Sequence, residues 1–239
     1  MRNLQTYLYF ALNTVVFLLG WVLWLSGEKC ISGSLIAAGG AGYVMFWATS
    51  ISITRSDGEA KLLGTIRSFG ISDVNDRRLL NEQYAAARKR TTERLDIMGF
   101  GLRNFIEDCS ADFAEWSKSF EIRILVVNPT SPYCKQRDYE EKDKAGKIKA
   151  DVLYATKIVR DLNNPRVKLR WYSAIPTTNV LRMDNVMWVG PYFIGERSRN
   201  AYVLTLQRDG VLFRQYLTHF ERIWTDPNLS CEPDSSKIT

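Results

Sequence analysis

Two long apolar runs stand at the beginning of the chain. The first is Tyr7–Leu25 and the second is Ile31–Ile53, and neither contains a charged side chain. Each has about the 20 residues that a helix needs to cross the hydrocarbon core of a bilayer. Only the short turn Ser26–Cys30 separates them. Residues 1–54 are therefore predicted to form two transmembrane helices joined as a hairpin.

Two other interpretations of the runs stay open. A cleaved signal peptide followed by one span fits the basic residue Arg2, but the first run is longer than the about 7–15 apolar residues usual in a signal peptide. A buried helical hairpin in a soluble protein is the third interpretation.

The rest of the chain alternates between helical and strand-like patterns. We expect a linker at 55–72, a soluble domain at 73–226 and a flexible tail at 227–239. Apolar residues at helical spacing predict helices at 76–94, 102–118, 139–162 and 211–224. Strand-like runs lie at 95–99, 121–128, 167–173, 180–182, 186–189 and 201–207. Helices and strands alternate early and strands follow one another later, which predicts an α/β domain with a mixed sheet and helices on both faces.

Small residues recur in the second apolar run. They are Gly33, Ser34, Ala37, Ala38, Gly39, Gly40, Ala41 and Gly42. Small side chains spaced by four residues let two helix backbones approach closely in lipid. They allow packing on the first helix of the same chain, oligomerisation with other chains, or both.

Charge changes this picture in two ways. Basic residues flank the hairpin at Arg2, Arg55, Lys61 and Arg67, whereas the turn between the runs has only Lys29. Since cytoplasmic loops carry the excess of Lys and Arg, we expect a multi-pass inner-membrane protein with both termini in the cytoplasm. The apolar runs lack Asp, Glu, Lys and Arg, which argues against a proton relay or an ion-coupled transporter.

The four cysteines do not have the spacing of a metal site. Cys30, Cys109, Cys134 and Cys231 form no C-x-x-C pair, and the chain has a single histidine. Reduced thiols in a cytosolic domain are the expected state. No metal and no cofactor are predicted.

The order of elements from Arg77 to Trp224 resembles one half of the phospholipase D fold. The resemblance lies in the strand–helix–strand segment Leu95–Pro129, the strand segment Arg166–Pro176, the hairpin segment Thr177–Tyr192 and the closing helix Tyr216–Trp224. In active members of that family the third segment reads His-x-Lys-x-x-x-x-Asp, followed by Gly-Ser and an Asn.

This chain departs from the motif at the positions that carry the chemistry. Asp184 matches the Asp, and Gly190 resembles the Gly but lies one residue early. Thr177 stands at the His position, Asn179 at the Lys position and Pro191 where the Ser would be. The family's histidine attacks phosphorus and its lysine stabilises charge on the phosphate. The resemblance therefore implies a domain without catalytic residues, and the single histidine, His219, is expected to be structural.

A phosphodiester pocket without its catalyst can still bind phosphate. The candidate ligand-binding residues are Gly99, Gly101, Arg103, Asn128, Thr130, Thr177, Asn179, Asp184, Arg197 and Arg199. Gly99 and Gly101 lie between a strand and a helix, where free backbone N–H groups favour anions. Each residue also has an ordinary interpretation: glycines as turn formers, Asn128 and Thr130 as a turn or cap, Asp184 in a hairpin turn, and the arginines as solvated surface.

The resemblance also implies a homodimer, because active family members build one site from two such halves. The layout, a two-span hairpin with a cytosolic domain, is similar to two-transmembrane effectors of bacterial anti-phage cyclic-nucleotide signalling. We therefore expect a membrane-anchored sensor or effector, with the lipid bilayer, a second copy of the chain and a nucleotide or cyclic nucleotide as partners.

Two alternatives come from other classes of function. One is an adaptor that binds a protein or lipid headgroups through basic patches such as Arg88–Arg90. The other is an unconventional phospholipase or nuclease. Nucleic acid is not an expected partner, because no groove of interleaved basic and aromatic residues is evident.

Overall fold

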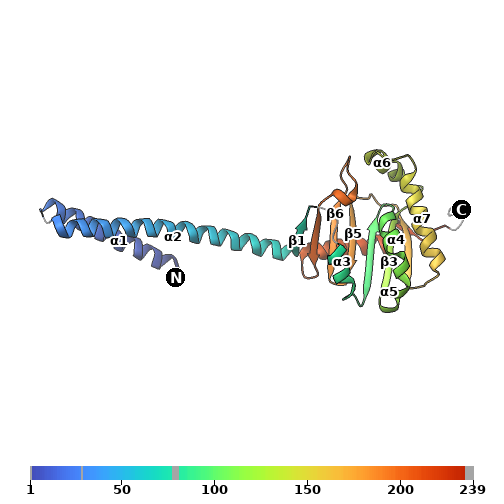
Figure 1. Ribbon diagram of the computed structural model, residues 1–239, viewed down its shortest axis with the longest axis horizontal. Helices are drawn as coiled ribbons and strands as arrows, with labels where there is room; N and C mark the ends of the chain where they lie inside the picture. Colours follow the sequence, from blue (N-terminus) through green and yellow to red (C-terminus); the bar gives the residue numbers. More distant parts are fainter. Residues whose placement is uncertain (1, 28, 77–80, 235–239) are drawn as a thin grey trace. The chain divides into compact units, whose positions relative to one another are not determined.

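The computed structural model describes residues 2–27, 29–76 and 81–234 of the chain. It divides into two compact units, Met1–Gly64 and Thr65–Thr239, which we call the hairpin unit and the α/β unit. The hairpin unit contains helix α1 (Arg2–Leu25) and most of helix α2 (Lys29–Phe69), which lie antiparallel and side by side (Figure 1). The predicted N-terminal helical hairpin is therefore confirmed.

Side chains from both helices interlock along the hairpin. The hydroxyl oxygens of Thr14 and Tyr43 lie 2.7 Å apart. The ring of Tyr43 also meets the rings of Phe10 and Phe17 edge-on, with centroids 5.5 and 6.1 Å apart. A hydroxyl pair inside an aromatic cluster fixes how the two helices face each other.

Glycines allow the close approach of α1 and α2. A Cβ on Gly39 would lie 2.9 Å from the Cα of Phe17, and a Cβ on Gly42 would collide with the side chain of Asn13. Gly33 and Gly40 have open space instead, with no atom within 4 Å of a Cβ built there. Packing within the hairpin thus accounts for Gly39 and Gly42, but not for the small residues on the outer face.

One described stretch is long and apolar enough to cross a membrane by length and composition, namely Ile31–Thr49. The described apolar part of α1, Phe10–Leu25, is shorter. The prediction of two spans, and with it of a multi-pass protein, stays a prediction. Large apolar side chains are nevertheless exposed on both helices, including Val22 at 63% and Val44 at 71%.

The segment predicted as a linker is mostly helical. Helix α2 continues without a break to Phe69 over 41 residues, and strand β1 (Ile71–Asn75) follows at once. An ion pair one turn apart, Arg55 with Glu59 at 3.0 Å, supports this exposed part of the helix. Gly58 and Gly64 of this segment are accommodated in the helix with open space around them.

The α/β unit is built on one eight-stranded sheet, in the order β1-β7-β6-β5-β2-β3-β4-β8. Its strands after β1 are β2 (Arg94–Gly99), β3 (Glu121–Val127), β4 (Val167–Tyr172), β5 (Thr178–Met183), β6 (Val186–Pro191), β7 (Val203–Gln207) and β8 (Ser230–Cys231). Strands β2, β3 and β4 are mutually parallel, and all other neighbours are antiparallel. The predicted mixed α/β sheet is confirmed. Strands β1 and β8 were not predicted, and β8 lies inside the segment predicted as a flexible tail.

The helices of this unit are α3 (Asn81–Arg88), α4 (Arg103–Cys109), α5 (Phe113–Ser119), α6 (Pro132–Glu140), α7 (Lys147–Leu162) and α8 (Val211–Thr225). The helix predicted at 102–118 is divided by a 3-10 turn at Ser110–Asp112. The prediction of a single helix at 139–162 is wrong, because the structure has two helices there, α6 and α7. Ser131 caps an earlier helix, α6, and Gly146 in the left-handed region starts α7. The first residues predicted in helix 76–94 include 77–80, which lie outside the described residues.

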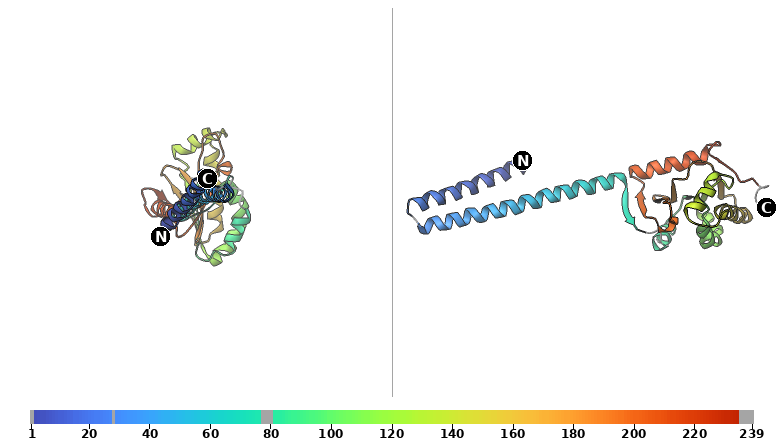
Figure 2. Two further views of the ribbon diagram at one scale, coloured as in Figure 1. Left: turned by 90° about the vertical axis from the view of Figure 1, so that its left-hand side faces the viewer. Right: turned by 90° about the horizontal axis from the view of Figure 1, so that it is seen from above.

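Both faces of the sheet are covered by helices. On one face, Trp171 of β4 donates to Thr156 of α7 at 3.0 Å, and Trp188 of β6 meets Tyr84 of α3 edge-on. On the other face, α8 supplies Glu221, which binds Arg123 of β3 at 2.6 Å. The right-hand view of Figure 2 shows α8 on one side and the green to yellow helices on the other.

Candidate functional site

The strand directions gather most of the candidate residues at one edge of the sheet, which we call the carboxyl edge. Strands β2, β3 and β4 end there at Gly99, Val127 and Tyr172. Strand β5 is antiparallel to β2, so it begins at this edge with Thr178. The carboxyl edge of a partly parallel sheet is where α/β proteins most often bind ligands.

Asn179 and Tyr172 are buried at this edge with polar atoms that have no hydrogen-bond partner among the described residues, and Asn179 has two such atoms. Its side chain is 1% exposed, and neither the amide oxygen nor the amide nitrogen has a hydrogen-bond partner among the described residues. Burying an unpaired amide costs about 1–3 kcal/mol. An orphaned amide of this kind is a candidate ligand contact.

Glycines flank Asn179 on both neighbouring strands. Gly190 of β6 pairs with it directly, and a Cβ on Gly190 would lie 3.4 Å from its amide oxygen. On the other side, Gly99 lies one step beyond the last β2–β5 pair, Met98 with Val180. A Cβ on Gly99 would meet the side chain of Leu102 and the hydroxyl of Tyr192. We call Gly99, Asn179 and Gly190 the glycine-flanked cradle.

Arg103 and Gly101 lie at the start of α4 but serve other contacts. The guanidinium of Arg103 binds Glu107 at 2.7 Å and Asp151 at 3.6 Å, and stacks over Tyr154. A Cβ on Gly101 would come within 2.5 Å of the Asp151 Cβ, so this glycine allows the loop to pack on α7. Burial raises the pKa of Asp151, although Lys147 and Arg103 oppose the shift.

Asn128 and Thr130 form a turn at the end of β3. The Asn128 side-chain oxygen accepts from the Thr130 N–H at 3.0 Å and from its hydroxyl at 2.7 Å. The next residue, Ser131, caps α6. These two candidates therefore lie at the carboxyl edge, with their polar groups engaged in local structure.

Asp184 lies at the opposite end of β5 from Thr177 and Asn179. It occupies the turn to β6 with φ of 47°, and its carboxylate accepts from the backbone N–H groups of Thr92, Glu93 and Arg94 at 2.8–3.1 Å. Burial would raise the pKa of Asp184, but these backbone hydrogen bonds outweigh it and hold the pKa low. Asp184 thus joins the β5–β6 turn to the start of β2.

Arg197 and Arg199 lie in and beside the 3-10 turn Ser198–Asn200. Arg197 binds Asp143 at 3.0 Å, whereas Arg199 is exposed and forms no ion pair within the described residues. An arginine that was not predicted as a site residue, Arg137, contacts the loop after β6. Arg137 of α6 is 1% exposed and donates to the carbonyls of Phe193 at 3.0 Å and Glu196 at 2.9 Å.

Arg137 also packs under aromatic rings and binds acidic neighbours. Its guanidinium lies 4.9 Å from the ring centre of Tyr192, and Glu141 neutralises it at 2.6 Å. Helix α6 therefore clamps the loop after β6 over the carboxyl edge. No sequence signal distinguished Arg137 from the other charged residues of its helix.

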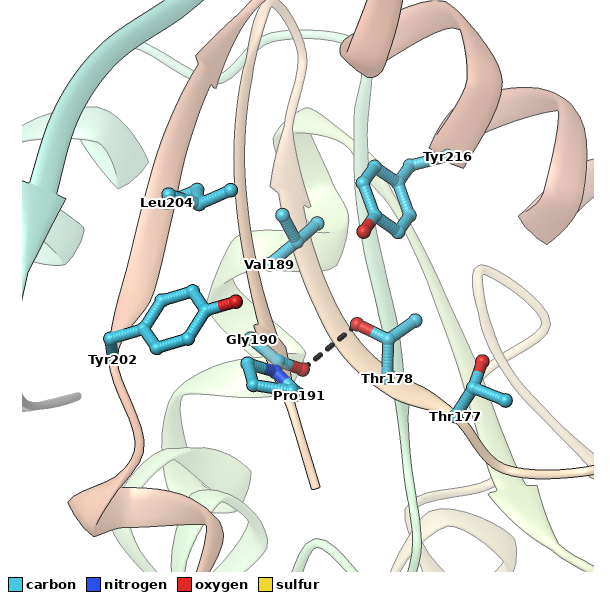
Figure 3. Close-up of a pocket in the computed structure, with 8 residues that line it drawn as sticks. All are labelled: Thr177, Thr178, Val189, Gly190, Pro191, Tyr202, Leu204 and Tyr216. Atoms are coloured by element: carbon cyan, nitrogen blue, oxygen red, sulfur yellow. Dashed lines mark hydrogen bonds between the residues drawn. The ribbon is translucent and has the colours of Figure 1, made fainter. Parts of the chain in front are cut away.

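A pocket of about 180 Å³ opens on the α8 face of the carboxyl edge (Figure 3). Strands β5, β6 and β7 and helix α8 supply its lining residues: Thr177, Thr178, Val189, Gly190, Pro191, Tyr202, Leu204 and Tyr216. Thr177 and Gly190 belong to the motif region, so the sequence pointed to this neighbourhood. The two tyrosines were not predicted as site residues, because isolated aromatic residues resemble core residues.

His219 lies on the outer side of α8, in a shallow groove with Arg214, Gln215, Thr218 and Arg222. Partial burial lowers the pKa of His219. No carboxylate or hydroxyl is hydrogen-bonded to it within the described part of the chain. A search of those residues also found no cluster of three or more His, Cys, Asp or Glu side chains suited to a metal ion. Burial raises the pKa of the Cys134 thiol to about 11, which disfavours the reactive thiolate.

No family model and no curated protein matches this chain. Among solved structures, it is similar to TrmBL2, described as an archaeal chromatin protein with a novel mode of DNA binding. The match has a TM-score of 0.42 and 11% identity, and covers 82% of this chain and 70% of the other.

Proposed function

We propose that this protein is a membrane-anchored sensor whose α/β unit binds a small phosphate-bearing ligand, a nucleotide or cyclic nucleotide, without turning it over. The observation that carries the proposal is the orphaned amide of Asn179 between Gly99 and Gly190 at the carboxyl edge. Asn179 and Thr177 stand where an active phospholipase D-like half has its catalytic residues. Amide and hydroxyl groups can hydrogen-bond a ligand but cannot form a phosphoenzyme.

The connection from the α/β unit to α2 supports a sensing role. Strand β1 follows α2 after a single residue, Gly70, and pairs with β7 at the end of the sheet. Gly70 also accepts a hydrogen bond from the Gln207 N–H at 2.9 Å, so the end of β7 is bonded to the end of α2. A ligand that changes β7 or α8 acts directly on the residues that terminate α2.

Thermal unfolding of the full chain in lipid nanodiscs tests the proposal. A ligand that binds the folded state at 100 times its dissociation constant stabilises it by about 2.7 kcal/mol. We expect at least one member of a panel of linear and cyclic nucleotides to raise the unfolding temperature. The variant Asn179→Leu should abolish this rise, whereas Asn104→Leu, at an exposed position on α4, should retain it. A panel without any effect on the folded protein contradicts the proposal.

The groove on α8 favours a second candidate, an adaptor for anionic lipid headgroups. Arg214 and Arg222 flank His219 there without a carboxylate partner among the described residues. Hydrogen exchange of the full chain in nanodiscs with and without phosphatidylglycerol tests this candidate. Protection of α8 that depends on the anionic lipid and is lost in the double variant Arg214→Glu/Arg222→Glu supports it, and exchange unaffected by lipid charge contradicts it. The variant Arg160→Glu, an exposed position on α7, is the control.

A further inference from the structure

The pocket between α8 and strands β5–β7 has the chemistry of a site for an uncharged ring. Val189, Leu204 and Pro191 supply apolar walls, and the rings of Tyr202 and Tyr216 lie on opposite sides of the space they enclose (Figure 3). Aromatic side chains stack on planar ligand rings with little dependence on the exact ring. No Asp, Glu, Lys or Arg is among the lining residues.

Hydroxyl groups supply the polar contacts of this pocket. Thr178 donates to the Gly190 carbonyl at 2.8 Å, so its hydroxyl oxygen faces a ligand as an acceptor. Tyr202, Tyr216 and Thr177 bring hydroxyls that can donate or accept. Burial raises the pKa of Tyr216, with Tyr202 adding to the shift, so its hydroxyl remains neutral at physiological pH. A neutral group that carries both donors and acceptors on a planar ring suits these contacts.

The walls of the pocket are also the elements that hold the end of α2. Leu204 lies on β7 and pairs with Val74 of β1, the strand that follows α2. Tyr216 lies on α8, whose preceding residue, Gly210, packs against Gly70. A ligand in the pocket therefore touches the elements that make two contacts near the end of α2, the β1–β7 pairing and the Gly70–Gly210 contact.

We infer that this pocket binds the nucleobase of a nucleotide, an uncharged heteroaromatic ring, between Tyr202 and Tyr216. The inference rests on the proposed function and extends it by naming the part of the ligand that the pocket recognises. Side chains alternate along β5, so Thr178 lines this pocket whereas Asn179 points to the other face of the sheet, and the pocket and the Asn179 amide are separate contacts at the carboxyl edge. The phosphate is left outside the ring pocket, whose lining residues include no arginine or lysine.

Calorimetric titration of the full chain in nanodiscs tests the assignment with separate probes for the two parts of a nucleotide. The probes are the four ribonucleosides, their 5′-monophosphates, ribose 5-phosphate and inorganic phosphate. We expect nucleosides to bind. The variant Tyr202→Ala should lower their affinity at least about fivefold, because base stacking is lost. Tyr216→Phe removes only the hydroxyl and should lower the affinity for nucleosides about fivefold. Tyr139→Ala, at an exposed tyrosine on α6 outside the pocket, should bind as the unmodified chain does.

The outcomes separate the two proposals. Binding of monophosphates or ribose 5-phosphate that is unchanged in Tyr202→Ala and Tyr216→Phe overturns the nucleobase pocket and leaves the proposed phosphate-binding function standing. Nucleoside binding that phosphate does not strengthen, and that both variants weaken, supports the pocket and contradicts the phosphate part of the proposed function. Absence of binding by every probe to a folded protein overturns the nucleobase pocket, and the proposed function is overturned as well when cyclic nucleotides added to the panel also fail to bind.

Discussion

Gly70 and Gly210 lie in backbone contact, and a Cβ on Gly70 would come within 2.5 Å of the Cα of Gly210. Gly70 ends helix α2 with φ of 81°, in the left-handed region, and Gly210 directly precedes α8. The contact joins the end of the helix that carries the apolar segment to the start of the helix that covers one face of the sheet. The proposed sensing role requires this link between the two glycines.

Replacing Gly70 by Ala is expected to destabilise the α/β unit by about 1–3 kcal/mol, because the side chain meets both a strained backbone angle and the backbone of Gly210. Gly64→Ala is the matched control, since Gly64 lies in the same helix with nothing within 4 Å of a Cβ. That change should be neutral or stabilising through helix propensity. Chemical denaturation of both variants in detergent checks the difference, and equal effects would refute the role of the contact.

Asp184 is predicted to be structural rather than catalytic. Asp184→Asn keeps a residue type tolerated in the left-handed region but removes the charge that accepts three backbone N–H groups. The expected loss is about 2–3 kcal/mol at neutral pH.

The same carboxylate gives acid sensitivity with a definite sign. The pKa of Asp184 is lower in the folded state than in the unfolded state, where it is about 3.9. Its contribution to stability is therefore present above about pH 4 and is lost as the pH falls through the folded value. Urea unfolding between about pH 2 and 7 should show a shallower acid decline in Asp184→Asn. An unchanged decline would show that other carboxylates carry it, such as Glu221, whose pKa is lowered by its hydrogen bond with Arg123.

Asn179→Leu is expected to make the ligand-free protein more stable, by about 1–3 kcal/mol, because leucine branches at Cγ as asparagine does and leaves no buried amide unpaired. Denaturant unfolding in the absence of ligand measures this gain. Asn104→Leu should change stability by less than about 0.5 kcal/mol, since Asn104 is exposed. A destabilised Asn179→Leu variant would mean that the amide is satisfied in the folded protein and is not held for a ligand.

The glycines of the hairpin separate packing within one chain from association between chains. Gly39→Leu should open the contact of α1 with α2, because the side chain meets the backbone of Phe17. Gly33→Leu and Gly40→Leu should leave the hairpin intact, since both positions face open space. Cysteine cross-linking at Thr14 and Tyr43 reports the hairpin contact, and light scattering reports the oligomer. If the outer variants dissociate an oligomer without losing the cross-link, the outer small residues join separate chains, and an unchanged oligomer argues against this.

Much of the α/β order was predictable from local pattern, because strands such as Glu121–Val127 are short and rich in Ile, Leu and Val. The pattern failed where a few backbone contacts decide. Strand β8 has two residues and exists because it pairs with β4, and the break between α6 and α7 depends on Gly146 at positive φ. Neither feature has a periodicity that a sequence window can detect.

Most of the candidate residues lie at one edge of the sheet, but their contacts could not be predicted from the sequence. Thr177, Asn179 and Gly99 lie at the carboxyl edge because β2 and β5 are antiparallel neighbours, a pairing that the sequence did not predict. Asp184 lies at the other end of its strand, and Arg103 and Arg197 bind carboxylates nearby. Arg137, Tyr202 and Tyr216 became visible only through tertiary packing, since each is an ordinary helix or strand residue by sequence.

One calorimetric titration of the full chain in nanodiscs with nucleotides tests the central claim most directly, because it records binding and turnover together. A ligand-binding protein without catalytic residues should give a saturable heat that returns to the baseline after each injection. The same heat should be absent in Asn179→Leu. A steady heat flow after injection would reveal phosphodiester hydrolysis, and no heat from any nucleotide would show that the unit does not bind this class of ligand; either result contradicts the account.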